Sequence, residues 1–237
     1  MQKRRCRFIS QLKGKYTRTV AAEILSRIGP DAIEAAPAFR DGLQTVVTDM
    51  TDDAFQMACA AGLVRIAATE ADVELGVEVI KSALNSADES PGRLGQRRYQ
   101  AYAVLNQLGP RAERFIPELI AGLADALGNY AVQILPSMNP AAVPALNQAL
   151  DSDQEISVTR AASCLGKMKA ESGKAIPKLE AAWGRVTSDW AKQAVMSAAM
   201  HIDPESGLSI AGKQQAELES VRYLARQHIA RINYVEN

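Results

Sequence analysis

The residues of this chain that could take part in catalysis or metal binding are few and widely separated. The two histidines, His201 and His228, fall on different predicted helices. A metal site needs several His, Cys or carboxylate ligands that converge, and no GxxxxGK or GxGxxG loop offers a phosphate cradle. We therefore expect a protein that is not an enzyme and that binds no metal and no cofactor.

Two carboxylate pairs have the residue types of a general acid and base. They are Asp52 with Asp53, and Asp151 with Asp153. Each pair belongs to a polar cluster before a predicted helix, as does Thr187-Ser188-Asp189. Side-chain oxygens at this position accept hydrogen bonds from the free N–H groups of the first helical turn. We interpret the three clusters as helix N-caps.

The three cysteines, Cys6, Cys59 and Cys164, have no paired spacing and no CxxC motif. Cys59 and Cys164 lie within apolar helical patterns, which predicts buried free thiols. An odd, scattered set fits a reducing compartment. No apolar run approaches the roughly 20 residues that span a bilayer, and no secretory signal follows the basic start. We expect a cytoplasmic protein without a transmembrane segment.

The net charge of zero hides a strong asymmetry along the chain. Residues 1–22 carry seven basic side chains and no acidic one, whereas residues 23–92 carry thirteen acids and four bases. We define residues 1–16 as the basic arm, with Lys3, Arg4, Arg5, Arg7, Lys13 and Lys15. The arm could be a capping helix with a solvated charged face. It could instead dock on its own acidic neighbours, on another copy, or on nucleic acid, a membrane or an acidic partner.

An arginine and tyrosine cluster follows a polar insertion at residues 85–96, which we expect to form a loop. The cluster consists of Arg93, Arg97, Arg98 and Tyr99. Arginine interleaved with tyrosine suits single-stranded nucleic acid, through phosphate contacts and stacking. The same residue types are common at the centres of protein–protein interfaces. The cluster also fits an ordinary amphipathic helix start.

Apolar triads with a spacing of three residues recur along the chain and predict one helix per repeat, which we name helix A. Aromatic residues make up only 5% of the chain, which also favours helices over sheets. The triads are Ala22/Leu25/Ile28, Ala60/Leu63/Ile66, Tyr102/Leu105/Leu108, Val132/Leu135/Met138, Ala162/Leu165/Met168 and, more weakly, Met196/Ala199/Ile202. A break follows most copies, for example Gly29-Pro30 and Gly109-Pro110. Gly past a helix end permits a left-handed cap, and Pro prevents continuation.

A second helix, helix B, is predicted after each break, usually with Pro in its first turn, where the missing N–H costs nothing. Its apolar positions are Phe39/Leu43, Leu119/Leu123, Leu146/Leu150 and Leu179/Trp183, with Val77/Ile80/Leu84 in a copy without Pro. Small residues flank this stripe at Gly42 and Gly122. We expect these glycines to face the neighbouring repeat and to let adjacent helices approach closely.

The repeated helical pairs resemble HEAT repeats, in particular the short bacterial type with Gly-Pro after helix A and Ile-Pro at the start of helix B. The resemblance covers roughly residues 17–206. It implies an all-α fold, a right-handed α-α superhelix (solenoid) of about five to six helical hairpins with capping helices at both ends. The whole chain, residues 1–237, would form one repeat domain, closed by a C-terminal capping helix at residues 207–237.

The resemblance is informative about fold and almost silent about function. Our main hypothesis is a non-catalytic scaffold or adaptor that binds a partner protein on its concave surface or loop edge. Exposed helix B positions that could contribute are Glu118, Gln148, Lys178 and Arg185. The alternative is a nucleic-acid-binding module that uses the basic arm and the arginine and tyrosine cluster. Partner identity and oligomeric state stay open.

Overall fold

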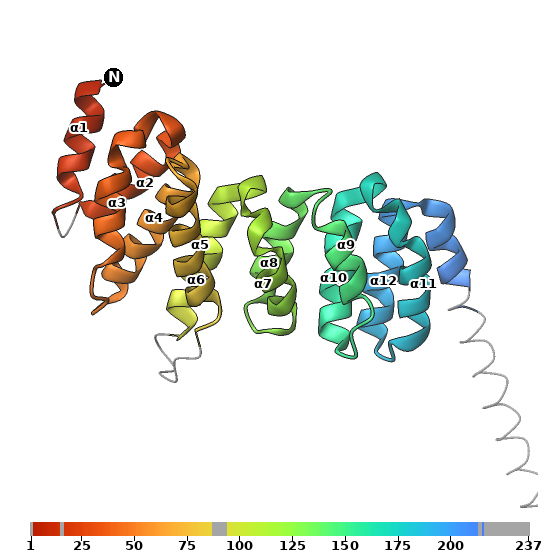
Figure 1. Cartoon of the computed structure of the whole chain (residues 1–237). Helices are drawn as coiled ribbons and strands as arrows, with labels where there is room; N and C mark the ends of the chain where they lie inside the picture. The colour runs from red at the N-terminus through yellow and green to blue at the C-terminus, as the bar shows by residue number, and fades with distance from the viewer. Residues whose placement is uncertain (1, 15–16, 87–93, 213–214, 216–237) are drawn as a thin grey trace, which may run out of the picture. The chain divides into compact units, whose positions relative to one another are not determined.

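The computed structural model describes the chain except for residues 1, 15–16, 87–93, 213–214 and 216–237 (Figure 1). Every regular element in the described residues is a helix, so the chain is all-α. The expected C-terminal capping helix lies mostly outside the described residues, although residues 204–212 are helical. Most of the predicted insertion loop also lies outside them.

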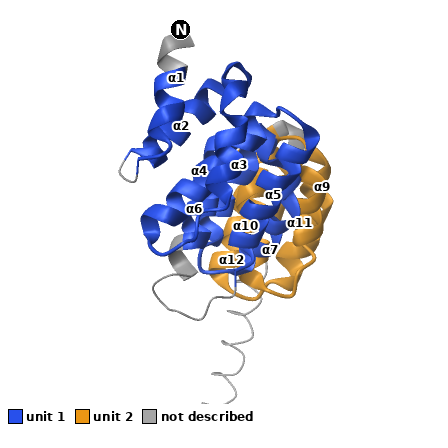
Figure 2. Ribbon diagram, turned by 60° about the vertical axis from the view of Figure 1, so that its left-hand side comes forward, with its two compact units in different colours: residues 1–138 blue, residues 139–237 orange. Residues whose placement is uncertain are grey.

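The chain divides into two compact units, Met1–Met138 and Asn139–Asn237 (Figure 2). Unit 1 contains α1 (Gln2–Gln11), α2 (Arg18–Ile28), η1 (Gly29–Ala35), α3 (Ala36–Leu43), α4 (Met50–Ile66), α5 (Glu70–Leu84), α6 (Leu94–Leu108), η2 (Gly109–Phe115), α7 (Ile116–Ala121), η3 (Gly122–Ala124), α8 (Gly128–Ile134) and η4 (Leu135–Met138). Unit 2 contains α9 (Val143–Ala149), α10 (Glu155–Met168), η5 (Lys169–Ala175), α11 (Ile176–Arg185) and α12 (Asp189–Ile202). Each η element is a 3₁₀ helix.

The predicted apolar stripes form the cores of both units. Leu25, Leu63, Leu105, Leu135 and Leu165 occupy the middle of their triads, and each is 0% exposed. The helix B positions are buried in the same way, including Trp183 at 5% exposed. Ile28, the last residue of the first triad, is 37% exposed, whereas the last residues of the next four triads are buried.

Three of the breaks between helices A and B are short 3₁₀ segments, namely η1, η2 and η5. Gly29 ends α2 with φ +71° and Gly109 follows α6 with φ +57°, and glycine adopts this left-handed region without a steric penalty. The helices that follow, α3, α7, α9 and α11, carry Pro in the first turn. The predicted role of Gly at these helix ends and of Pro at the following helix starts is therefore confirmed.

Helix α4 is the most enclosed element of unit 1. Thirteen of its 17 residues are buried, and it contacts α2, α3, α5 and α6. In Figure 1 these helices surround it on several sides. A helix that is buried on all faces needs apolar or small residues all around, as the AFQMACAAGLV stretch of α4 provides.

The start of α4 corrects the expected position of an N-cap. Asp49 is the N-cap, and its carboxylate accepts hydrogen bonds from the N–H groups of Thr51 and Asp52. Asp52 lies at the third helical position, and its carboxylate accepts from the N–H of Asp49, which completes a capping box. The clusters before α10 and α12 make no side-chain cap bond of the predicted kind.

The two flanking glycines pack differently from each other. A Cβ at Gly42 would lie 2.5 Å from Sγ of Cys59 and 3.1 Å from Cζ of Phe55, both on α4. This approach joins α3 to the next repeat, as expected. A Cβ at Gly122 would instead meet the hydroxyl of Tyr102 on α6, the first helix of the same hairpin.

Candidate interaction surfaces

The two described arginines of the predicted cluster are held by contacts within unit 1. The guanidinium of Arg97 donates to the carboxylate of Asp53 and, at 2.9 Å, to Oε1 of Gln56. Arg98 donates to the carboxylate of Asp125. Both arginine side chains are only 25% exposed. Their donors therefore bind acids of the chain itself, and Arg93 lies outside the described residues.

The aromatic member of the cluster has a different environment. Tyr99 is 43% exposed and packs edge-on against Tyr130 of α8, which is 36% exposed. The ring centroids lie 5.4 Å apart with an interplanar angle of 78°. Tyr130 also lies 5.9 Å from the buried ring of Tyr102, measured between centroids. Tyr130 thus packs on the buried ring of Tyr102, and Tyr99 packs on Tyr130 at the surface.

Ion pairs connect neighbouring repeats of unit 1, both between their A helices and between their B helices. The pairs are Arg18–Asp52 between α2 and α4, Asp53–Arg97 between α4 and α6, Arg40–Asp72 between α3 and α5, and Lys81–Glu118 between α5 and α7. The acids Asp52, Asp53 and Asp72 are 5%, 6% and 2% exposed. Part of the acidic excess of residues 23–92 is therefore buried in the fold, where each of these carboxylates forms an ion pair with a basic side chain.

Asp52 shows how strongly such a carboxylate is held. It accepts hydrogen bonds from the hydroxyl of Thr48 at 2.6 Å, from the N–H of Thr48 at 2.9 Å, and from Arg18. These bonds, that from the Thr48 hydroxyl above all, keep the pKa of Asp52 well below its usual range, despite the opposing effect of burial. Arg18 also lies 4.6 Å from the ring centroid of Phe55.

The predicted helix B positions have mixed surroundings. Glu118 and Lys81 form an ion pair of 2.9 Å, and the Glu118 side chain is 14% exposed. Lys178 pairs with Asp151, and Arg185 donates to the carbonyl oxygen of Leu150 at 2.5 Å. Gln148 is exposed. Glu118 belongs to unit 1. In unit 2, Lys178 and Arg185 both contact Asp151, and the N–H of Asp151 donates to the carbonyl oxygen of Gln148, so three of the four predicted positions meet around this residue.

The N-terminal segment forms a helix, α1, that packs on α2. Leu12 is buried, Phe8 and Ile9 are half-buried, and Arg7 and Lys13 are exposed. A helix with one apolar face against the first repeat and charges in solvent fits the capping interpretation. The side chains of Lys3, Arg4 and Arg5, and Lys15 as a whole, lie outside the described part of the chain.

Glu155, at the start of α10, is a structural residue that the sequence did not single out. Its carboxylate accepts from the hydroxyls of Ser188 and Thr187 and from the N–H groups of the same two residues. These bonds, led by that from the Ser188 hydroxyl, lower the pKa of Glu155 from 4.5 to about 2. One carboxylate of α10 thus accepts four hydrogen bonds at the start of α12, the corresponding helix of the next repeat.

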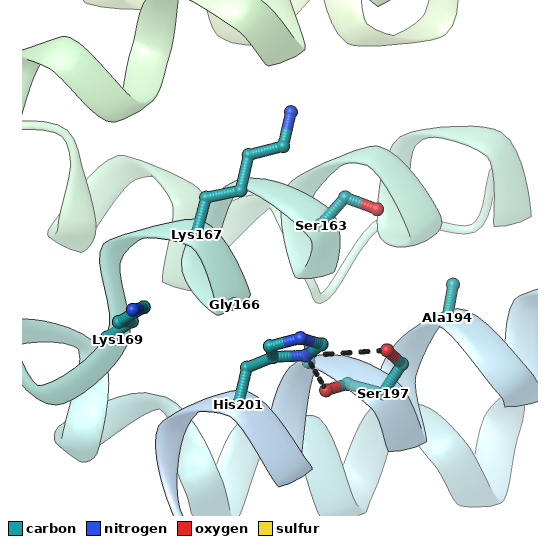
Figure 3. Close-up of a pocket in the computed structure, with 8 residues that line it drawn as sticks. Ser163, Gly166, Lys167, Lys169, Ala194, Ser197 and His201 are labelled. Atoms are coloured by element: carbon teal, nitrogen blue, oxygen red, sulfur yellow. Dashed lines mark hydrogen bonds between the residues drawn. The ribbon is translucent and has the colours of Figure 1, made fainter.

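A cavity of about 470 Å³ opens between α10 and α12 in unit 2 (Figure 3). Ser163, Gly166, Lys167, Lys169, Ala194, Ser197, Ala198 and His201 line it. Nδ1 of His201 lies 2.6 Å from the carbonyl oxygen of Ser197, which can only accept, so Nδ1 carries the proton. Gly166 lets the two helices approach, because a Cβ there would lie 3.0 Å from Cα of Ala198.

Lys169 combines an unusual backbone with a position in this cavity. It ends α10 with φ +55° and ψ −129°, close to the conformation of Gly29 at the end of α2, with φ +71° and ψ −140°. A side chain in this region costs on the order of 1–3 kcal/mol. Sequence reasoning overlooked the cavity, although one signal was present: a lysine takes the place that glycine holds in two other repeats.

The two buried thiols have the properties of structural cysteines. Burial raises the pKa of the Cys164 thiol to about 12, and that of Cys59 is also raised by burial. Both thiols are buried and neither is in a disulfide, as predicted. Within the described residues, no three His, Cys, Asp or Glu side chains are placed to hold a metal ion. None of the described helices is both long and apolar enough to cross a membrane.

Comparisons with known proteins leave the family open. No protein-family model matches the chain, and no curated protein matches its sequence. Among solved structures, it is similar to a crystal structure of an engineered protein, with 20% identity, a TM-score of 0.43, and coverage of 85% of this chain and 96% of that chain. A likeness of this degree carries no argument about function.

Proposed function

We propose that the chain is a HEAT-like α-solenoid that acts as a non-catalytic protein-interaction scaffold, with its contact site at the edge formed by Tyr99 and Tyr130. In this proposal about five to six hairpins stack into a right-handed superhelix. The repeated order of helix A, 3₁₀ segment and Pro-led helix B supports it. So do the contacts between successive A helices, α2 with α4, α4 with α6, and α10 with α12.

The observation that carries the functional proposal is the exposed tyrosine pair. Tyrosine is enriched among the residues that dominate protein–protein binding, since its ring buries a large area and its hydroxyl still finds a partner. Tyr99 packs against Tyr130, which itself packs against the buried Tyr102, so little side-chain freedom is lost on binding. Tyr99 on α6 belongs to the arginine and tyrosine cluster of the sequence, and Tyr130 on α8 adds a second ring.

The nucleic-acid alternative is weaker at this edge. Phosphate binding needs cationic groups that face solvent, whereas Arg97 and Arg98 are paired with Asp53 and Asp125. Binding of nucleic acid there would require these pairs to open. We therefore propose a protein partner, and crosslinking from this edge distinguishes the two classes of macromolecule.

Photo-crosslinking from position 99 tests the proposal. Tyr99 is replaced by p-benzoylphenylalanine, which keeps an aromatic ring, and cells are irradiated before the tagged chain is purified. Ile33, which is 53% exposed on η1 of the same unit, takes the same replacement as a control. We expect a protease-sensitive adduct from position 99 and much less from position 33. An adduct that nuclease removes would support the alternative, and equal yields from both positions would contradict the proposal.

A further inference from the structure

The cavity between α10 and α12 has a basic rim and a nonpolar floor. Lys167, Lys169 and His201 contribute the basic groups, and none of the described lining residues is acidic. Gly166, Ala194 and Ala198 supply small apolar surface between them. Figure 3 shows Lys169 at the end of α10 and His201 on α12, while the side chain of Lys167 points away from α12. The volume of about 470 Å³ is in the range of cavities that enclose a ligand group.

Helix ends alone do not account for this arrangement. The last turn of a helix attracts cations, and Lys167 already lies in the last turn of α10. Lys169 adds a second cation at a strained position where glycine would fit without cost. Strained residues that persist in a fold are a feature of functional sites. Glycine at this position would have no side chain, whereas the side chain of Lys169 lines the cavity.

We propose that this cavity binds an acidic segment of a partner protein that carries an apolar side chain, an inference that rests on the proposed scaffold function. The apolar side chain lies against Gly166, Ala194 and Ala198. Glutamate or aspartate side chains beside it meet the ammonium group of Lys169. A segment without acids makes no ion pair with Lys169, and a segment without an apolar residue leaves the apolar part of the cavity open to water.

The direct test is fluorescence anisotropy with the full-length purified chain. The probe is a fluorescein-labelled heptapeptide with a central leucine–phenylalanine pair flanked by glutamates. Two companion peptides carry lysines in place of the glutamates, or serine–glycine in place of the apolar pair. We expect only the first peptide to bind with a Kd below about 1 mM. Absence of saturable binding by it, or equal binding of all three, would overturn the proposal.

Substitution of Lys169 separates binding from stability. Lys169→Gly relieves the left-handed strain, so we expect Tm to rise by about 2–4 °C, while peptide affinity falls about threefold to fivefold. Lys174→Gln removes one charge from the exposed part of η5, outside the lining set, and leaves the affinity unchanged. Lys169→Gly that keeps wild-type affinity, or a matching loss in Lys174→Gln, would contradict the proposed site.

Ala194→Glu provides a second variant, since it places inside the cavity a carboxylate that repels the acidic peptide. We expect it to abolish peptide binding while circular dichroism stays helical. Octanoate tests the other source of this chemistry, a free small carboxylate. If octanoate saturates the cavity and the peptide does not bind, the proposal is wrong. Because Tyr99 lies in unit 1, loss of this site leaves the crosslink from position 99 intact, so failure of the two proposals can be told apart.

Discussion

At the residue scale, Glu155 shows how one carboxylate connects two helices. It accepts bonds from the hydroxyls and N–H groups of Thr187 and Ser188, and these keep its pKa at about 2 in the folded chain. Its ordinary pKa is 4.5. A carboxyl whose pKa is lower in the folded state contributes stability above the unfolded value. That contribution disappears as the pH falls through the folded value.

The pH dependence of Tm tests this role. Glu155→Gln should melt below the wild type at pH 6, and the difference should shrink as the pH falls from about 4.5 to about 2. Glu180→Gln on α11 is the matched control, and its difference from the wild type should not narrow in the same way. A constant gap between Glu155→Gln and the wild type from pH 6 to pH 2 would show that the hydrogen bonds do not distinguish the ionised carboxyl.

At the element scale, close helix contacts depend on single glycines. A Cβ added at Gly42 on α3 would meet Cys59 and Phe55 of α4, whereas a Cβ added at Gly184 on α11 would have no neighbouring atom within 4 Å. Alanine is favoured over glycine in a helix by up to about 1 kcal/mol. The same substitution should therefore have opposite effects at these two positions, because only Gly42 has a neighbour in the way.

Urea unfolding of two alanine variants measures the difference. Gly42→Ala should lower the free energy of unfolding by about 1–2 kcal/mol, because overpacking outweighs the gain in helix propensity. Gly184→Ala should leave it unchanged or raise it by up to about 1 kcal/mol. If Gly42→Ala is as stable as Gly184→Ala, then α3 and α4 can separate at little cost and the contact does not set their distance.

The sequence predicted the helices and their cores because both depend on local periodicity. Leu105 and Leu165 lie at the middle of triads that recur, and both are fully buried. The cap of α4 was misplaced by three residues because Asp49, Asp52 and Asp53 all have suitable side chains within one turn. Which of them receives the N–H groups depends on where the chain leaves the extended conformation, and side-chain type alone does not reveal this.

The pairing of Arg97 with Asp53 could not be predicted from the sequence for another reason. The two residues are 44 positions apart, and periodicity fixes which face a residue occupies but not which partner it meets on the next repeat. The cavity depends on a similar long-range property, the close approach of α10 and α12 at Gly166 and Ala198. Residue types in the sequence therefore indicated the arginine and tyrosine cluster, and the structure shows that Tyr99 is more exposed than Arg97 or Arg98.

At the scale of the whole molecule, charged and aromatic residues have separate tasks in the proposed scaffold. The ion pairs Arg18–Asp52, Asp53–Arg97 and Arg40–Asp72 hold successive helices together. The exposed rings of Tyr99 and Tyr130 remain for a partner. Since Arg97 and Tyr99 are close in sequence and lie on the same helix, substituting each of them tests this separation within one small region.

The most direct measurement compares Arg97→Gln and Tyr99→Ser for unfolding in urea and for pull-down of the partner that crosslinking from position 99 identifies. Arg97→Gln leaves the buried Asp53 without its ion pair, so it should lose about 1–3 kcal/mol of stability yet still recover the partner. Tyr99→Ser should stay within about 1 kcal/mol of the wild type and lose most of the partner. The opposite pattern, a folded Arg97→Gln without partner and a Tyr99→Ser with full recovery, would contradict the proposed division between structural charges and a binding aromatic edge.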